Sequence, residues 1–112
     1  MTLYAFAPPI LPGKVEAWRE FCREIGEHPN EHAESRRRLG IRRESAWLQQ
    51  VPQRGSLAVV VWDVEAPNRV YEGLEMSDDP YDRWFARRLE QINAIDLRRP
   101  PPMNELGVEW QA

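Results

Sequence analysis

Six apolar residues in a row, Leu57-Ala58-Val59-Val60-Val61-Trp62, constrain the fold of this chain more than any other stretch. A turn sequence at residues 52–55 precedes the run and a helix-start sequence at residues 65–67 follows it, so the run is typical of a strand. A strand with one face in water alternates apolar and polar residues, and this one does not. We therefore expect both faces of the strand to be covered, although the rest of the chain supplies helices for only one side of a sheet.

Periodicity and turn residues define the remaining elements. We expect further strands at residues 3–7, 41–51 and 105–110, and helices at residues 14–25, 30–39, 67–76 and 80–92. Asp79 is expected to cap the last helix, with Pro80 in its first turn. The resulting order, β-α(α)-β-β-α(α)-β, predicts one α+β domain over residues 1–112, a ferredoxin-like βαββαβ fold with split helices and an antiparallel four-stranded sheet. Strands 3–7 and 57–62, which lack polar alternation, are expected at its centre.

The loop between strands 41–51 and 57–62 decides which side chains share a face. With a four-residue loop, 52–55, one face carries Trp47, Gln49, Ala58, Val60 and Trp62. The other face carries Ala46, Leu48, Leu57, Val59 and Val61, a small aliphatic set that we expect against the helices. Indole rings with one amide are typical of a small-molecule pocket, so the predicted ligand-binding residues are Tyr4, Trp47, Gln49 and Trp62 on the helix-free face. The alternative is that these side chains form a packed dimer core.

Residues 28–32 spell His-Pro-Asn-Glu-His, the H-x-x-E-H spacing of one class of zinc peptidases. That motif needs both histidines on one helical face, and Pro29 opposes a helix that runs back through His28. No third ligand stands out, so the sequence predicts a bend between two helices, no metal site and no cofactor. The single cysteine, Cys22, lies on the apolar side of the first helix and is interpreted as a small buried filler.

The charge pattern argues against nucleic acid as a partner. The net charge is −3, and the arginines of residues 36–43 stand near Glu31, Glu34 and Glu44, so we interpret them as a solvated helix end. An RNA-binding sheet of this topology needs basic and aromatic residues along its third strand, which residues 57–62 do not provide. The acidic residues of the last third, Asp78, Asp79, Asp82 and Asp96, are interpreted as capping and turn residues rather than as a metal or acid–base site.

Two further features of the sequence predict where in the cell the protein is found. No apolar run approaches the roughly 18 residues that a membrane span needs, so no membrane is expected. A single cysteine excludes an internal disulfide and fits a reducing compartment, so the sequence predicts a cytoplasmic protein.

Several motifs resemble those of a known family. The element order, the helix start Pro12-Gly13-Lys14, and the block of residues 77–85 (SDDPYDRWF) followed by Ile95-Asp96-Leu97 resemble a family of small, uncharacterised bacterial proteins in the dimeric α+β barrel superfamily. The resemblance covers nearly the whole chain and implies a homodimer in which the helix-free sheet face meets its partner. The superfamily includes cofactor-independent monooxygenases, polyketide cyclases, haem-degrading enzymes and stress-responsive proteins, but none of their catalytic residues matches a position here.

Two functions stay open at this point. The favoured one is a small-molecule-binding or structural module without chemistry. The other is a cofactor-independent monooxygenase- or cyclase-like enzyme acting on a small aromatic or polyketide-like substrate. Such an enzyme would need a histidine, an acid or a tyrosine in the cavity beside Gln49, whereas a binding module would not.

Overall fold

A computed structural model describes residues 2–112 of the chain. The apolar run forms the middle of β4 (Gly55–Val64). Within these residues, β4 pairs with every other strand. Its partner on one side is β3 (Ile41–Val51). On the other side lie β1 (Thr2–Phe6) and then β2 (Pro9–Ile10), and all pairings are antiparallel. The predicted α+β class and the four-stranded antiparallel sheet are therefore confirmed, and they are compatible with a ferredoxin-like fold.

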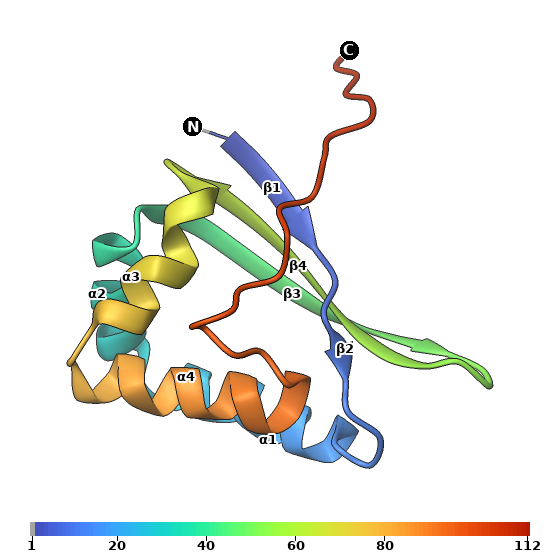
Figure 1. Cartoon of the computed structure of the whole chain (residues 1–112), viewed down its shortest axis with the longest axis horizontal. Coiled ribbons are helices and arrows are strands. Elements are labelled where there is room, and N and C mark those ends of the chain that lie inside the picture. Colours follow the sequence, from blue (N-terminus) through green and yellow to red (C-terminus); the bar gives the residue numbers. More distant parts are fainter. Residues whose placement is uncertain (1) are drawn as a thin grey trace.

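Four α-helices lie on one side of these strands (Figure 1). They are α1 (Val15–Glu27), α2 (Pro29–Arg38), α3 (Val70–Met76) and α4 (Pro80–Asn93), and a 3-10 turn (Pro67–Arg69) precedes α3. The predicted start of α4 is confirmed, because the Asp79 side chain accepts hydrogen bonds from the backbone N–H groups of Tyr81 and Asp82. No helix within residues 2–112 is long and apolar enough to cross a bilayer.

The predicted faces of β4 are wrong. Val51 pairs with Gly55, so the hairpin loop has three residues, 52–54, instead of four. Gly55 takes a φ of +98°, which glycine adopts without strain, and this lets it serve as the first paired residue of β4. A shift of one residue moves every side chain of a strand to the opposite face. Trp47 therefore lies opposite Val59 on the helix-free face, whereas Trp62 faces the helices and is only 5% exposed.

The predicted C-terminal strand is also wrong, because residues 105–110 form no strand. The segment passes the free edge of β1 (Figure 1), where Asn104 donates from its backbone N–H to the Tyr4 hydroxyl and from its side chain to the Ala5 carbonyl. The preceding prolines, residues 100–102, have no N–H to donate to a strand ladder, so they cannot start a strand along β1. In the described structure β1 is thus an edge strand and not a central one.

Candidate functional site

A cavity of about 360 Å³ lies between the helices and the sheet. Six aromatic rings line it, those of Phe6, Trp18, Phe21, Trp62, Tyr71 and Phe85. Aliphatic side chains complete its wall, among them Ile25, Ala46, Ala58, Val60, Leu74 and Leu89. Protein interiors normally have few voids larger than a water molecule, so a space of this size is a specific feature of the fold.

Residue size on the sheet explains why the space exists. Where β3 and β4 face the helices, they present the small side chains of Ala46 and Ala58. Across the space, α1 presents Trp18 and Phe21, which lie one turn apart and are its two buried residues. The large rings hold the helix away from the sheet, while the alanines leave the middle unfilled.

One end of the cavity is polar, and Glu44 on β3 is its centre. Its Oε1 accepts a hydrogen bond from His32 Nε2 at 2.9 Å, and its Oε2 accepts from Arg36 NH1 at 3.0 Å and from Trp62 Nε1 at 2.8 Å. Burial alone would raise the pKa of Glu44, but the His32 hydrogen bond and the Arg36 charge outweigh it and lower the pKa to about 2. Glu44 is therefore an ionised, fully engaged carboxylate that positions its neighbours.

A β-bulge lies just before Glu44 in β3 and turns Ile41 to the same side. Ile41 pairs with Val64 and Arg43 with Asp63, so Arg42 is an extra residue in β3. The extra residue brings Ile41 and Glu44 to the same, helix-facing side, although they are three positions apart. Bulges of this kind re-aim side chains next to functional sites.

His32 on α2 lies between Glu44 and a tyrosine. The Glu44 carboxylate can only accept, so the Nε2–H of His32 donates to it. On the other side of the ring, Nδ1 lies 2.6 Å from the Tyr81 hydroxyl. Burial raises the pKa of Tyr81 to about 12, which keeps this hydroxyl protonated. The imidazole is thus held in one orientation at the cavity wall.

Arg36, one turn after His32 on α2, is only 7% exposed. Its NH1 group donates to Glu44, its NH2 group donates to Ser35 Oγ at 3.0 Å, and the guanidinium lies 4.4 Å from the centre of the Phe85 ring. Its Nε–H is buried and has no hydrogen-bond partner among the described residues. Buried N–H groups are nearly always paired, so this donor is an exception among the described residues.

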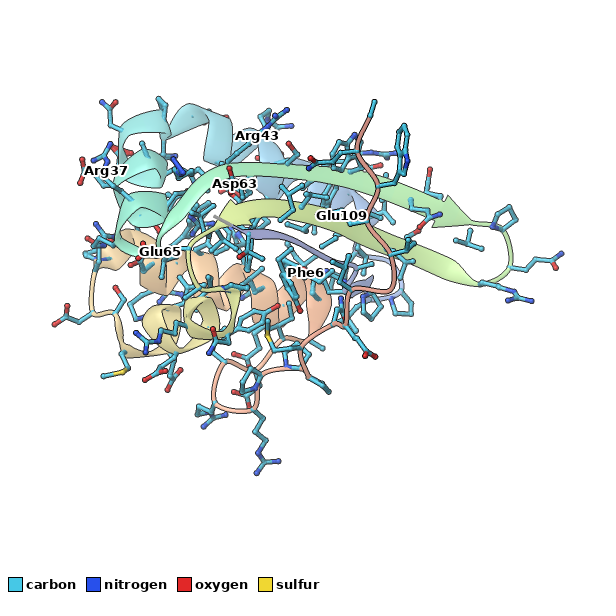
Figure 2. The ribbon with its side chains drawn as sticks, turned by 90° about the horizontal axis from the view of Figure 1, so that it is seen from above. Phe6, Arg37, Arg43, Asp63, Glu65 and Glu109 are labelled. Atoms are coloured by element: carbon cyan, nitrogen blue, oxygen red, sulfur yellow. The ribbon has the colours of Figure 1, made fainter. Side chains whose placement is uncertain are left out.

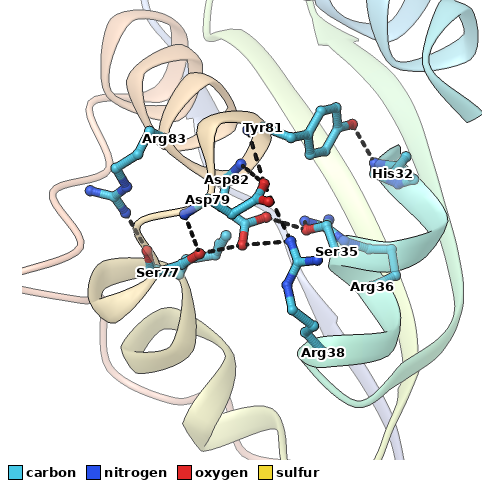
Figure 3. A network of polar contacts seen from close by, with 10 residues as sticks. His32, Ser35, Arg36, Arg38, Ser77, Asp79, Tyr81, Asp82 and Arg83 are labelled. Carbon is cyan, nitrogen blue, oxygen red and sulfur yellow. Dashed lines mark hydrogen bonds and ion pairs between the residues drawn. The ribbon is translucent and has the colours of Figure 1, made fainter. Parts of the chain in front are cut away.

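A second polar group holds α2 against α4. Asp82, 1% exposed, accepts hydrogen bonds from Ser35 Oγ at 2.5 Å, Ser77 Oγ at 2.6 Å and Arg38 NH2 at 3.0 Å (Figure 3). Burial opposes ionisation of Asp82, but these three hydrogen bonds outweigh it and lower its pKa. Since Ser35 also contacts Arg36, this cluster fixes the helix that carries both His32 and Arg36 (Figure 3).

A second hollow adjoins the polar end. It is an open groove between α2 and β3, lined by Arg36, Arg37, Arg42 and Arg43 with Glu44 as its one carboxylate. Figure 2 shows Arg37 and Arg43 at the same end of the molecule. His32, Arg36 and Glu44 line both hollows, so they form the wall between the apolar cavity and the arginine groove.

The structure does not bring the four predicted ligand-binding residues together. Trp62 lines the cavity, and Tyr4 packs beside it with ring centres 6.2 Å apart. Trp47 and Gln49 lie on the opposite face of the sheet, because the hairpin loop is one residue shorter than expected. The predicted grouping is therefore wrong, although the pairing of Tyr4 with Trp62 on one face is correct.

Sequence reasoning missed His32, Arg36 and Glu44. The sequence pattern places His32 in an inter-helix bend and Arg36 in a solvated helix end. Both interpretations are wrong, because the two side chains line the cavity. The predicted break at residue 28 is correct, since α2 starts at Pro29 and the His28 ring contacts the Glu24 carbonyl. Among residues 2–112, no group of three or more His, Cys, Asp or Glu side chains is arranged to hold a metal ion.

Comparison with known proteins adds no candidate function. No protein family, no curated protein and no solved structure matches this chain. The cavity and its polar end therefore define the candidate site by their geometry alone.

Proposed function

We propose that this protein binds a small, largely aromatic molecule in the cavity between its helices and β4. The observation that supports this most directly is the cavity itself, with six aromatic side chains in its wall and a hydrogen-bonded polar cluster at one end. The space opens to solvent beside the exposed Ala46, so its apolar wall contacts water when it is empty. A bound molecule would be stabilised by about 25 cal/mol for each Å² of apolar surface that it removes from water.

The size of the space limits the ligand. A dry cavity of roughly 150 Å³ takes up benzene, and drug-sized ligands occupy roughly 300–1,000 Å³. A cavity of about 360 Å³ thus fits a two-ring molecule, or one ring with a side chain. The polar cluster would fix its orientation, as a few placed polar groups do in other ligand pockets.

Calorimetric titration with benzamide and 1-naphthamide tests this function. We expect measurable binding, with 1-naphthamide tighter because it fills more of the cavity. The variant Ala58→Leu would fill the space from β4 and abolish binding. Ala5→Leu, on an exposed position of β1, is the matched control and should bind as the wild type does. Binding that persists in Ala58→Leu, or no binding of either probe to the wild type, would refute the proposal.

A cofactor-independent enzyme, monooxygenase- or cyclase-like, is the second candidate. The observation that favours it is the hydrogen-bonded chain Tyr81–His32–Glu44, whose imidazole lines the cavity and would act as a general base once Nδ1 is released from the Tyr81 hydroxyl. The test is exchange of the α-protons of 2-tetralone for deuterium in D₂O, followed by NMR. An enzyme would accelerate the exchange, and His32→Gln would remove the acceleration without removing binding. Equal exchange rates with and without protein would leave only the binding function.

We further propose that two copies associate through the helix-free face of the sheet. Trp47 is 56% exposed there and Leu3 is 65% exposed, next to the half-buried side chains of Val59 and Val61. Large exposed apolar side chains gathered on one face of a sheet often mark a protein–protein contact. The C-terminal segment adds the exposed side chains of Leu106, Val108 and Trp110. Light scattering at micromolar concentration should give about twice the mass of one chain, and a folded monomer would refute the dimer.

A further inference from the structure

We infer that the C-terminal segment, residues 105–110, pairs with the free edge of β3 in a second copy of the chain, so that two copies swap these segments. This inference rests on the proposed association of two copies through the helix-free face of the sheet. It adds the strand pairing that joins the two sheets at their edges. It follows from an unprotected strand edge, from a segment with a strand pattern and no cover, and from the separation of the two within one copy.

The free edge of β3 lacks the usual protection. In the described part of the chain, β3 pairs with β4 alone. The Ala58 N–H donates to the Pro8 carbonyl, away from β3, so Leu48, which lies opposite Ala58, points its own N–H away from β4. Ala46, two residues earlier, does the same. Sheets usually protect such an edge with charged residues or proline, and residues 45–51 (SAWLQQV) contain neither.

The C-terminal segment has the pattern of a strand but forms none in the described structure. Leu106, Val108 and Trp110 alternate with glutamate and glycine, as in a strand with one covered face. These three side chains are 70%, 86% and 82% exposed. Large apolar side chains gathered on an exposed segment often mark a contact with another protein chain.

Within one copy, the segment and the free edge of β3 lie on opposite sides of β4. Asn104 bonds to Tyr4 and Ala5 of β1, and β4 separates β1 from β3. A two-fold axis parallel to the strands, between two stacked sheets, places the β1 edge of one copy across from the β3 edge of the other. Stacked sheets lie about 10 Å apart and residues 105–110 can extend roughly 20 Å, so the segment reaches that edge.

The direction of the segment also matches the charges. It runs opposite to β1 (Figure 1), and β1 and β3 run the same way because each is antiparallel to β4. In the two-fold arrangement the segment is therefore antiparallel to β3 of the other copy, and Glu109 lies near the start of that strand, at Arg42 and Arg43. Both arginines are exposed and have no ion-pair partner among the described residues. Such charge complementarity sets the register more than it adds affinity.

Amide hydrogen exchange followed by NMR tests this inference at the free edge of β3. Val108→Pro removes an N–H from the segment and prevents it from continuing as a strand. The variant should therefore speed amide exchange at Ala46 and Leu48 at least about tenfold relative to the wild type. Exchange at Trp47, whose N–H points to β4, should stay slow in both proteins.

A mixing experiment shows whether the segment comes from another copy. Isotopically labelled Val108→Pro protein is mixed with an excess of unlabelled wild type, so that most labelled chains have an intact partner. Slow amide exchange at Ala46 and Leu48 of the labelled chains should return, because the wild-type copy supplies its segment. The matched control, Gln111→Pro alone, should exchange as the wild type does, since residue 111 lies beyond the segment.

The outcomes separate the segment swap from the dimer on which it rests. Fast amide exchange at Ala46 and Leu48 in a wild-type dimer, slow exchange that persists in Val108→Pro, or no recovery on mixing overturns the swap and leaves the dimer. A folded monomer of the wild type in light scattering overturns both. If Val108→Pro alone dissociates into monomers, the recovery on mixing with wild type decides.

Discussion

Trp62 and Glu44 lie directly opposite each other on β4 and β3, and the Trp62 indole Nε1–H donates a 2.8 Å hydrogen bond to Oε2 of Glu44. A buried indole needs a partner for its N–H, and a buried carboxylate needs donors, so this one contact satisfies both. It also places the largest side chain of the apolar run against the helices. The inner wall of the cavity and its polar end are thus joined through a single pair of residues.

The first prediction concerns this pair. Trp62→Ala should lower the free energy of unfolding by about 3–5 kcal/mol, because it empties a core aromatic site. Trp62→Phe keeps most of the ring and loses the N–H, so it should cost less, about 1–3 kcal/mol for the partner left unsatisfied. Urea unfolding followed by circular dichroism measures both values.

The matched change on the other face is Trp47→Ala. Because Trp47 is exposed on the helix-free face, its removal should change the unfolding of one subunit by less than about 1 kcal/mol. It should instead make the protein dissociate on dilution at concentrations where the wild type stays paired. Equal losses of subunit stability for Trp62→Ala and Trp47→Ala would show that the assignment of faces is wrong.

The hairpin shows how much the sequence can predict and where it stops. The bounds of β3, residues 41–51, and the cap of α4 at Asp79 follow from local patterns, and both are correct. The face that Trp62 presents depends on whether the loop has three or four residues, and the sequence from Pro52 to Gly55 suits either. An error of one residue in the loop length moves every side chain of the strand to the other face of the sheet. A small local ambiguity therefore becomes a large error in the candidate site.

The sequence predicts only part of the polar end of the cavity. Alternation places Glu44 on the same side of β3 as Ala46 and Leu48, which were expected against the helices, so its inward direction could have been predicted. His32 and Arg36 are four residues apart and share a helical face, which is a second usable signal. Their meeting with Glu44 could not be predicted, because it depends on how α2 packs across β3.

A second prediction follows from the low pKa of Glu44. The folded-state pKa is about 2 and the ordinary value is 4.5, so the ionised form stabilises the fold. This contribution, on the order of a few kcal/mol, is complete above pH 4.5 and is lost as the pH falls towards 2. Unfolding by urea at pH 7, 4 and 2.5 should show a loss of stability that is smaller in Glu44→Gln.

The control for that experiment is Glu34→Gln. Glu34 pairs with Arg37 on the exposed side of α2, where an ion pair contributes little. The pH dependence of this variant should follow the wild type, with stability within about 0.5 kcal/mol at pH 7. If Glu44→Gln follows the wild type as closely as Glu34→Gln does, Glu44 is not the buried, low-pKa group described above.

A third prediction concerns Asp82. Asp82→Ala removes the acceptor for Ser35, Ser77 and Arg38 at a fully buried place, so it should lower the free energy of unfolding by about 3–5 kcal/mol. Asp78→Ala, at an exposed position just before α4, should stay within about 0.5 kcal/mol of the wild type. A small effect of Asp82→Ala in thermal or urea unfolding would mean that the α2–α4 contact does not depend on this carboxylate.

A fourth prediction uses Cys22, which lines the cavity and is the single cysteine of the chain. Burial raises the pKa of the thiol, so alkylation by iodoacetamide at pH 8 should be slower in the folded protein than in the unfolded one. Saturating 1-naphthamide should slow it at least several-fold further, because the probe covers the sulfur. Mass spectrometry of quenched samples gives both rates. If 1-naphthamide does not slow the alkylation of Cys22, the probe binds outside the cavity.

The most direct measurement is a set of intermolecular NOEs between the ring protons of bound 1-naphthamide and the methyl groups of β4. Ala58 and Val60 line the cavity, whereas Val59 and Val61 lie on the other face of the same strand. Binding between the helices and the sheet predicts NOEs to the Ala58 and Val60 methyl groups and none to Val59 and Val61. NOEs to Val59 and Val61 alone would place the ligand on the helix-free face and contradict the cavity as the binding site.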